Sequence, residues 1–126
     1  MKIAILGVGR LGAFHAKVLR ALPGVDELRI NDADSARAAS LAKELGAKHA
    51  ATIDDAFSGV DAAVIVTPTG THADLIRRAL DKGLPVFCEK PIALDLESTK
   101  RIVDHVFNSH GPAVPLFLAE TMRVIC

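Results

Sequence analysis

Three glycines near the start of this sequence have the spacing of a loop that binds phosphate groups. The stretch ILGVGRLGAFH contains Gly7, Gly9 and Gly12 as G-x-G-x-x-G, directly after an apolar run. The first glycine permits a tight turn, the second lets a diphosphate approach the backbone, and the third lets a helix pack against a sheet. The amides of Arg10 and Leu11, at the positive end of that helix, would then hold the diphosphate. The alternative is a turn that merely needs glycine, but the strand before the loop and the helix after it favour phosphate binding.

An acidic residue twenty positions after Gly12 completes this pattern. Asp32 ends a predicted strand, where its carboxylate can accept hydrogen bonds from both hydroxyls of an adenosine ribose. A 2′-phosphate there would be repelled, and the next residue is Ala33 rather than an arginine. Arg37 is an exception to consider, but it lies inside the following predicted helix, which Asp34 is better placed than Asp32 to cap. The sequence therefore predicts NAD as the cofactor, in preference to NADP.

A second loop, TPTGTH, follows the most apolar predicted strand. Thr67 and Thr69 offer hydroxyl groups to cofactor or substrate oxygens, and Pro68 stiffens the loop. His72 falls in the first turn of the next helix, where it could face the same crevice or serve as a cap or surface histidine. We therefore include all four residues among the candidate binding residues.

A third group consists of an acid, a base and a proline after a short apolar strand. Lys90 could bond a substrate hydroxyl or the nicotinamide ribose and assist a proton transfer, while Glu89 balances its charge and Pro91 fixes the turn. The alternative is a solvated ion pair at a strand end. His15, one turn past Gly12, is expected to pack beneath the glycine loop.

Apolar runs alternate with helical patterns along the whole chain. The expected strands lie at 2–6, 27–32, 48–51, 61–67, 85–88 and 113–119, and the expected helices over about 11–22, 35–45, 71–82 and 96–106. Because the strands read as continuous apolar runs, they are typical of parallel strands covered by helices on both faces. We therefore expect an α/β fold, a Rossmann-type doubly wound parallel sheet of five to six strands. Ligands bind beyond the carboxyl ends of such strands, near the switch in strand order, which the strands ending at Leu6 and Val66 flank.

Local signals mark the ends of these helices. Leu11, Phe14, Val18 and Leu22 recur at helical spacing in the first helix, which Pro23 and Gly24 end. Asp34 can cap the second helix and Gly46 can end it, while Asp54 or Asp55 starts a short helical turn.

The composition narrows the class of protein. A length of 126 residues predicts one domain, and fifteen basic residues balance fifteen acidic ones, which argues against nucleic acid or an anionic membrane as partner. No stretch approaches the roughly 20 apolar residues of a membrane span, and no signal-peptide pattern is present. Two cysteines, Cys88 and Cys126, make neither a disulfide framework nor a metal cluster. We expect a cytoplasmic protein without a metal and with a small-molecule partner.

Together, these motifs resemble the N-terminal domain of the glucose–fructose oxidoreductase and inositol dehydrogenase family, Gfo/Idh/MocA. The resemblance covers residues 1 to about 112 and rests on G-x-G-x-x-G-x-x-H from Gly7, T-P-x-x-x-H from Thr67 and E-K-P from Glu89. It implies an NAD(P)-dependent oxidoreductase acting on a sugar, polyol or related carbonyl compound, with Lys90 contacting substrate and nicotinamide ribose. The glycine loop and NDADSARA look most like inositol 2-dehydrogenase relatives. The alternatives are a stand-alone dinucleotide-binding or sensing module, which has no reason to keep E-K-P, and another Rossmann reductase.

The tail departs from the family pattern. Family members continue into an α+β domain that carries an acid–base pair, the rest of the substrate pocket and the oligomer interface, and none of it is in this sequence. Where they read G-F-x-R-R-[FY]-D, this chain reads LFLAETMRVIC. Shifting the codons of 116–124 by one base permits F-x-R-R-[ND]-D, so residues 113–126 are interpreted as an aberrant tail from a frameshift or sequencing error. The coding DNA would decide this, and a stop codon within a few codons of the shifted frame would sink the idea.

Overall fold

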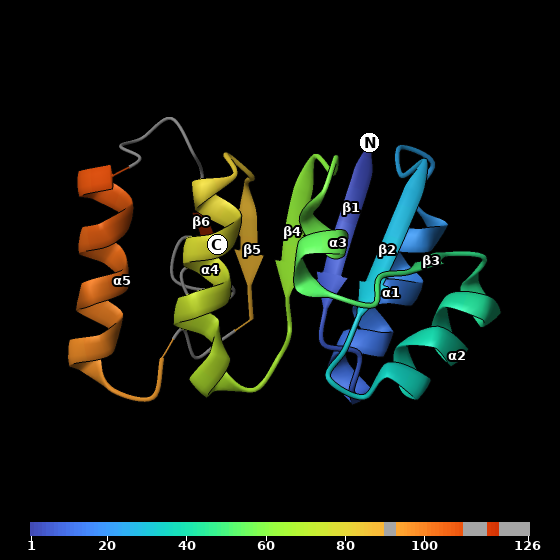
Figure 1. Ribbon diagram of the computed structural model, residues 1–126, viewed down its shortest axis with the longest axis horizontal. Coiled ribbons are helices and arrows are strands. Elements are labelled where there is room, and N and C mark those ends of the chain that lie inside the picture. Colours follow the sequence, from blue (N-terminus) through green and yellow to red (C-terminus); the bar gives the residue numbers. More distant parts are fainter. Residues whose placement is uncertain (90–92, 110–115, 119–126) are drawn as a thin grey trace.

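Six parallel strands form one sheet in the order β3-β2-β1-β4-β5-β6 (Figure 1). The computed structural model describes residues 1–89, 93–109 and 116–118. The strands are β1 (Lys2–Leu6), β2 (Glu27–Asn31), β3 (Lys48–His49), β4 (Ala62–Ile65), β5 (Val86–Cys88) and β6 (Leu116–Leu118). Neighbouring strands all pair in parallel. The prediction of a doubly wound parallel α/β sheet is confirmed, and β1 and β4 meet at the switch in strand order.

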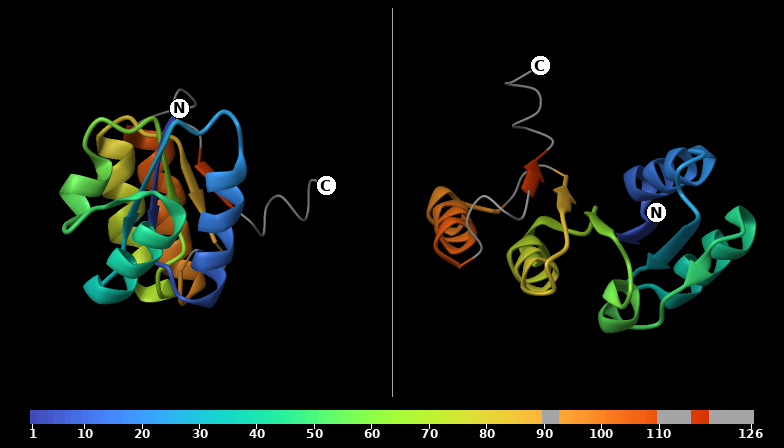
Figure 2. Two further views of the ribbon diagram at one scale, coloured as in Figure 1. Left: turned by 90° about the vertical axis from the view of Figure 1, so that its right-hand side faces the viewer. Right: turned by 90° about the horizontal axis from the view of Figure 1, so that it is seen from above.

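Helices cover both faces of this sheet. They are α1 (Arg10–Ala21), α2 (Ser35–Leu45), α3 (Ile53–Phe57), the 3₁₀ turn η1 (Thr69–Thr71), α4 (His72–Asp81) and α5 (Leu96–Ser109). Figure 2 shows α1 and α2 on one face and α3, α4 and α5 on the other. Two buried clusters correspond to these faces, one between β1, β2, α1 and α2, and the other between β1, β4, β5, α3, α4 and α5.

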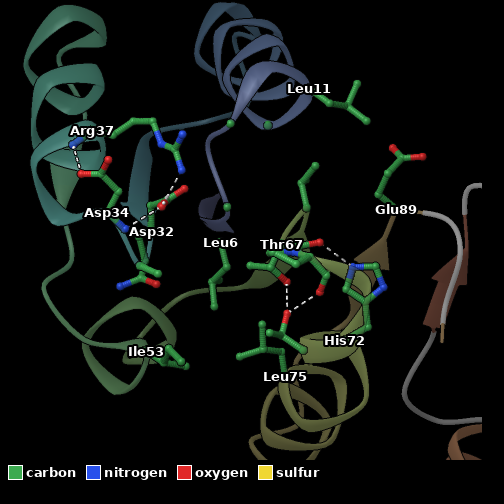
Figure 3. Close-up of a pocket in the computed structure, with 18 of the residues that line it drawn as sticks. Leu6, Leu11, Asp32, Asp34, Arg37, Ile53, Thr67, His72, Leu75 and Glu89 are labelled. Atoms are coloured by element: carbon green, nitrogen blue, oxygen red, sulfur yellow. Dashed lines mark hydrogen bonds and ion pairs between the residues drawn. The ribbon is translucent and has the colours of Figure 1, made fainter. Parts of the chain in front are cut away.

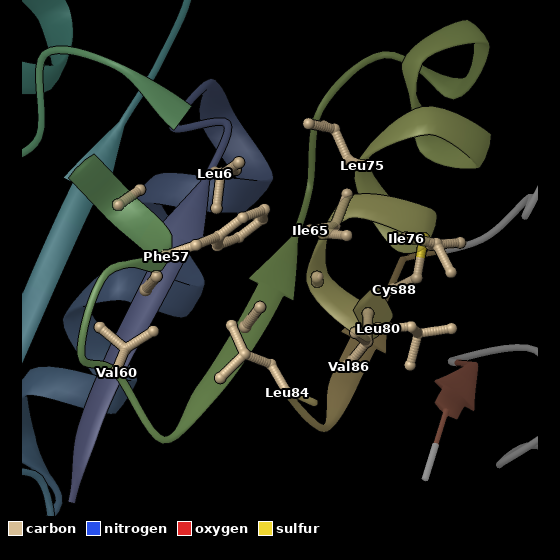
Figure 4. Close-up of a cluster of buried hydrophobic side chains, with 14 of the residues drawn as sticks. Leu6, Phe57, Val60, Ile65, Leu75, Ile76, Leu80, Leu84, Val86 and Cys88 are labelled. Atoms are coloured by element: carbon tan, nitrogen blue, oxygen red, sulfur yellow. The ribbon is translucent and has the colours of Figure 1, made fainter. Parts of the chain in front are cut away.

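The second cluster packs the strongest predicted strand against α4. Ile65, Leu80 and Val86 are fully buried, and Ile76 lies beside them (Figure 4). Leu75, Ile76, Ala79 and Leu80 thus form the buried apolar face of α4. The cluster holds β4 and β5 side by side, so that both strands deliver their carboxyl ends to one edge of the sheet.

Capping signals set two helix starts. The Asp34 side chain accepts a hydrogen bond from the Arg37 amide, and Gly46 ends α2 at φ 64°, as predicted. The predicted start of α3 at Asp54 or Asp55 is one or two residues too late, because the helix begins at Ile53 and its cap is the Thr52 hydroxyl, which accepts from the Asp55 amide at 3.0 Å. Asp54 and Asp55 lie in the first turn, where their charges suit the positive helix end.

The orientation of α1 differs from that of an ordinary amphipathic helix. An apolar stripe at helical spacing usually faces the core. Here Leu11, Phe14, Val18 and Leu22 are exposed, and the residues of α1 that are buried are Gly12 and Ala16. The helix lies so close to the sheet at Gly12 that only small side chains fit beneath it. On the face of the sheet that carries α1 and α2, no helix of the described part of the chain covers β4, β5 and β6 on the far side of α1.

The predicted tail falls mostly outside the described residues. Of the strand expected at 113–119, the structure describes Leu116–Leu118 as β6, whereas 110–115 and 119–126 are outside it. The interpretation of 113–126 as aberrant therefore stays a prediction. Among the described residues, no helix has the length and apolar character needed to cross a membrane.

Candidate functional site

A cavity of about 1230 Å³ lies at the carboxyl ends of β1, β2, β4 and β5 (Figure 3). It is lined by most of the predicted site residues, namely Gly7, Gly9, Arg10, Leu11, Gly12, Asp32, Thr67, Pro68, His72 and Glu89. Lys90 and Pro91 lie outside the described residues. Within those residues, no group of three or more His, Cys, Asp or Glu side chains could hold a metal ion.

Two glycines allow the backbone segments beneath the cavity to cross closely. Gly7 has a φ of 91°, and a Cβ there would lie 2.6 Å from the carbonyl of Val66. A Cβ on Gly12 would lie 1.9 Å from the carbonyl oxygen of Gly7. Real Cβ atoms do not approach backbone that closely, so both positions require glycine for the fold itself.

Gly9 differs from its two neighbours in the motif. A Cβ built on Gly9 meets no atom within 4 Å, and its backbone is extended rather than left-handed. Gly9 is the N-cap of α1 and supplies no side-chain cap, so the first-turn amides face the cavity without one. This open surface at a helix N-terminus fits an anionic group such as a diphosphate.

Asp32 lies just beyond β2, with its side chain only 6 % exposed. Its Oδ2 accepts from the Val8 amide at 2.7 Å, and its Oδ1 accepts from the Asp34 amide at 2.8 Å. Burial raises the pKa of the Asp32 carboxyl, but these amides and the Arg37 guanidinium together outweigh it and hold the pKa below its usual value. The carboxylate is therefore ionised and fixed at the rim of the cavity.

Arg37 is a neighbour of Asp32 that the sequence did not reveal. Its position inside α2 gave no indication of this contact. The structure places its Nη2 3.1 Å from Asp32 Oδ1, with half of the Arg37 side chain exposed. Both residues line the cavity, so a cation stands directly beside the predicted ribose-binding carboxylate.

The loop after β4 is braced by hydrogen bonds around Thr67. Thr71 Oγ1 donates to the Pro68 carbonyl at 2.7 Å and lies 2.6 Å from Thr67 Oγ1. Thr69, one of the predicted binding residues, does not line the cavity, whereas Thr71 does. The 3₁₀ turn explains this difference, since it starts at Thr69 and brings the third residue of the turn back over Thr67.

His72 touches the cavity but is almost completely buried. Only 1 % of it is exposed, and its Nε2 lies 2.9 Å from the Thr67 carbonyl oxygen. Because a carbonyl only accepts, this nitrogen must carry the proton. His72 therefore anchors the Thr67 loop to the start of α4.

Glu89 extends from the end of β5 toward the glycine helix. Its amide donates to the Ile65 carbonyl at 3.0 Å, and its Oε2 lies 3.1 Å from His15 Nε2. The His15 ring also contacts the rings of Phe14 and Phe87 edge-on, so it packs toward β5, and its expected place beneath the glycine loop stays a prediction. Its contact with Glu89 was not predicted, because 74 positions separate the two residues along the sequence.

This arrangement of loops has counterparts among known proteins. The Gfo/Idh/MocA family, an oxidoreductase family with an NAD-binding Rossmann fold, matches residues 1–114. The chain belongs to this family. The resemblance inferred from the three motifs is thereby confirmed, and residues 1–114 are a Gfo/Idh/MocA NAD-binding domain.

Several individual Gfo/Idh/MocA relatives and related structures are similar to the chain. The NAD-dependent scyllo-inositol 2-dehydrogenase of Bacillus subtilis is 38 % identical over 112 residues, covering 84 % of this chain and 32 % of that protein. The scyllo-inositol dehydrogenase of Lactobacillus casei, solved with NAD(H) and scyllo-inositol, superposes with a TM-score of 0.85 at 32 % identity, covering 98 % of this chain and 37 % of that one. A UDP-N-acetylglucosamine 3-dehydrogenase of Acidithiobacillus ferrooxidans has a TM-score of 0.83 at 32 % identity, covering 98 % of this chain and 38 % of that one. The chain thus spans about a third of the length of these proteins.

Proposed function

We propose that this chain binds NAD in the cavity, as the cofactor domain of a dehydrogenase that oxidises a CH–OH group of a sugar or polyol. The observation that carries the proposal is the pairing of two features in one cavity. The open N-terminus of α1 at Gly9 suits a diphosphate, and the ionised Asp32 suits the ribose hydroxyls next to it.

The described residues fit the two halves of NAD differently. The backbone at Gly9, Arg10 and Leu11 would hold the diphosphate, and Asp32 would accept from the adenosine ribose. Thr67, Pro68 and Thr71 after β4 would contact the nicotinamide half, together with His72 and Glu89, because these residues all line the cavity. When bound, NAD supplies the nicotinamide C4 that accepts a hydride.

The preference for NAD over NADP rests on Asp32. Its carboxylate is ionised and nearly buried, so that the 2′-phosphate of NADP would meet a fixed negative charge. The Bacillus subtilis relative carries NAD(+) in its name, which agrees with this preference.

The substrate proposal comes from the relatives and from the E-K-P motif. Two of the relatives described above are scyllo-inositol dehydrogenases by name, and one acts on a nucleotide sugar. We assign Lys90 the role of binding and polarising the substrate hydroxyl, with Glu89 beside it and Pro91 fixing the turn. This role rests on the family resemblance, because Lys90 lies outside the described residues.

We further propose that the 126-residue chain binds NAD but oxidises little or no polyol. Oxidation of an alcohol needs a base, and two imidazole groups at or near the cavity are already engaged. His72 is bonded to the Thr67 carbonyl, and His15 to Glu89. Incubation with NAD and scyllo- or myo-inositol should give no NADH absorbance above a substrate-free control, and steady turnover would refute this part of the proposal.

Calorimetric titration with NAD tests the binding proposal. Gly9→Ala places a methyl group on the open surface where the diphosphate would approach, and should weaken NAD binding about tenfold, which corresponds to a loss of about 1.4 kcal/mol. Gly24→Ala is the matched control, because a Cβ at that glycine also meets nothing within 4 Å and Gly24 lies outside the cavity lining. Equal affinity of the two variants, or no NAD binding by the unsubstituted chain, would overturn the proposal.

A further inference from the structure

We propose that Arg37 and Asp32 act as one discriminator between NAD and NADP, in which Arg37 is a 2′-phosphate ligand that Asp32 holds neutralised. The proposal rests on the proposed function, because it requires the adenosine ribose to lie at Asp32. It adds a specificity-determining residue to that site and changes the reason why NADP is rejected. Removing the carboxylate alone should then create an NADP site, with no new cation needed.

The exposure of the two side chains supports this role. The Asp32 side chain is 6 % exposed, whereas that of Arg37 is 51 % exposed. A ligand that arrives from solvent at this rim therefore meets the guanidinium more readily than the carboxylate. Arg37 also presents donors beyond the Nη2 that bonds Asp32, since a guanidinium has five N–H groups.

The anchoring of Asp32 explains why the Asp32–Arg37 pair excludes the 2′-phosphate of NADP in the unsubstituted chain. Two backbone amides fix the Asp32 carboxylate, so it cannot swing away from an approaching anion. The charge of Arg37 is balanced by that carboxylate at 3.1 Å, and the pair offers a 2′-phosphate little net attraction. A ribose hydroxyl needs no net charge and can still donate to the remaining lone pairs of Asp32.

The other groups at this rim limit the size of the expected effect. Asp34 lies on the same turn, and its Oδ1 is occupied by the Arg37 amide. Ser35 adds a hydroxyl that lies 3.5 Å from His49 Nε2. One negative charge therefore stays near the site after Asp32 is neutralised, so we expect a moderate gain in NADP affinity.

The first test uses Arg37→Met in the otherwise unsubstituted chain. Loss of the guanidinium leaves the Asp32 charge uncompensated, so NADP affinity should fall about fivefold while NAD affinity stays within about twofold, because one partly exposed charge is removed. Arg101→Met is the matched control, since Arg101 lies on α5 and does not line the cavity. Equal NADP affinities for the two variants would overturn the proposal. This test does not depend on whether an Asp32 variant folds.

The second test compares Asp32→Asn with the double variants that add Arg37→Met or Arg101→Met. Asp32→Asn should weaken NAD and strengthen NADP, each by about tenfold, because a charged hydrogen bond is lost and a guanidinium is released for the phosphate. Adding Arg37→Met should abolish the NADP gain, and adding Arg101→Met should not. Raising the salt concentration should weaken NADP binding to Asp32→Asn more than NAD binding, because the new contact is ionic and exposed.

The outcomes separate this inference from the proposed function. If the unsubstituted chain binds NAD and the NADP affinity does not respond to Arg37, only the discriminator proposal fails. If no variant binds either nucleotide, the proposed cofactor function fails and this inference fails with it. An NADP gain in Asp32→Asn that survives Arg37→Met would assign the phosphate to another cation and would also overturn the proposal.

Discussion

The two ends of the cavity are held together by different kinds of interaction. At the Asp32 end, one carboxylate accepts hydrogen bonds from the amides of Val8 and Asp34 and from the guanidinium of Arg37. At the Thr67 end, a buried imidazole and a threonine hydroxyl bond to carbonyl groups of the same loop. The first end is therefore built on charge and the second mainly on neutral hydrogen bonds. We expect the first to respond to pH and salt, and the second to respond to the loss of individual side chains.

The backbone segments that cross closely at Gly7 and Gly12 join the two ends of the cavity. A substitution at this crossing should have the largest effect on stability. Gly12 contacts the Gly7 carbonyl on one side, and its Cβ would lie 3.6 Å from the Val66 Cβ on the other. Gly12→Ala should lower the free energy of unfolding by about 3 kcal/mol or more, because overpacking against backbone has no side chain that can yield. Urea unfolding measures this cost, with Gly9→Ala as the control that should change stability by well under half as much. A cost for Gly12→Ala equal to that of Gly9→Ala would show that the two ends are not joined rigidly at this crossing.

His72 tests the neutral end. His72→Leu removes the donor to the Thr67 carbonyl in a nearly fully buried position, and should destabilise the fold by about 1–3 kcal/mol. His72→Gln keeps an N–H donor of similar length and should recover part of that loss. Thermal or urea unfolding of both variants gives the comparison. Equal destabilisation by the two substitutions would mean that packing, rather than the hydrogen bond, holds this loop.

The pH dependence of stability tests the charged end. Because the pKa of folded Asp32 lies below its usual value, its stabilisation is fully present above the unfolded pKa of about 4 and is lost as pH falls through the folded pKa. Asp32→Asn should therefore show a shallower loss of stability on acidification than the unsubstituted chain.

Thr71→Ala is the matched control at the neutral end and should keep the full acid slope. Other carboxyls, such as Glu27, also have a lowered pKa and contribute to that slope, so only the difference between variants is informative. Parallel acid slopes for Asp32→Asn and the unsubstituted chain would contradict a charge-based Asp32 end.

The sequence revealed the two ends unequally. Gly7, Gly12 and Asp32 could be predicted because each performs a local task at a fixed spacing in one βαβ unit. The contact between His15 and Glu89 could not be predicted, because it depends on tertiary structure. It needs both the strand order, which puts β5 two strands away from β1, and the position of α1 relative to the end of β5. Arg37 was misjudged because a helix position does not by itself fix where a long side chain ends. The exposed stripe on α1 was unexpected because the close crossing at Gly12, which turns small residues toward the sheet, is a tertiary feature.

The smallest expected effect concerns the contact between Glu89 and His15 at the second end. Glu89 and His15 are 17 % and 27 % exposed at their side chains, so solvent partly screens their contact. Glu89→Gln keeps the shape and should cost about 0.5 kcal/mol of stability, in line with partly exposed ion pairs. We expect its NAD affinity to stay within about threefold of the unsubstituted chain, well short of the tenfold loss for Asp32→Asn. A tenfold loss on titration with NAD would instead mean that the charge of Glu89, and not only its shape, is needed to bind the cofactor, and both ends of the cavity would then depend on charge.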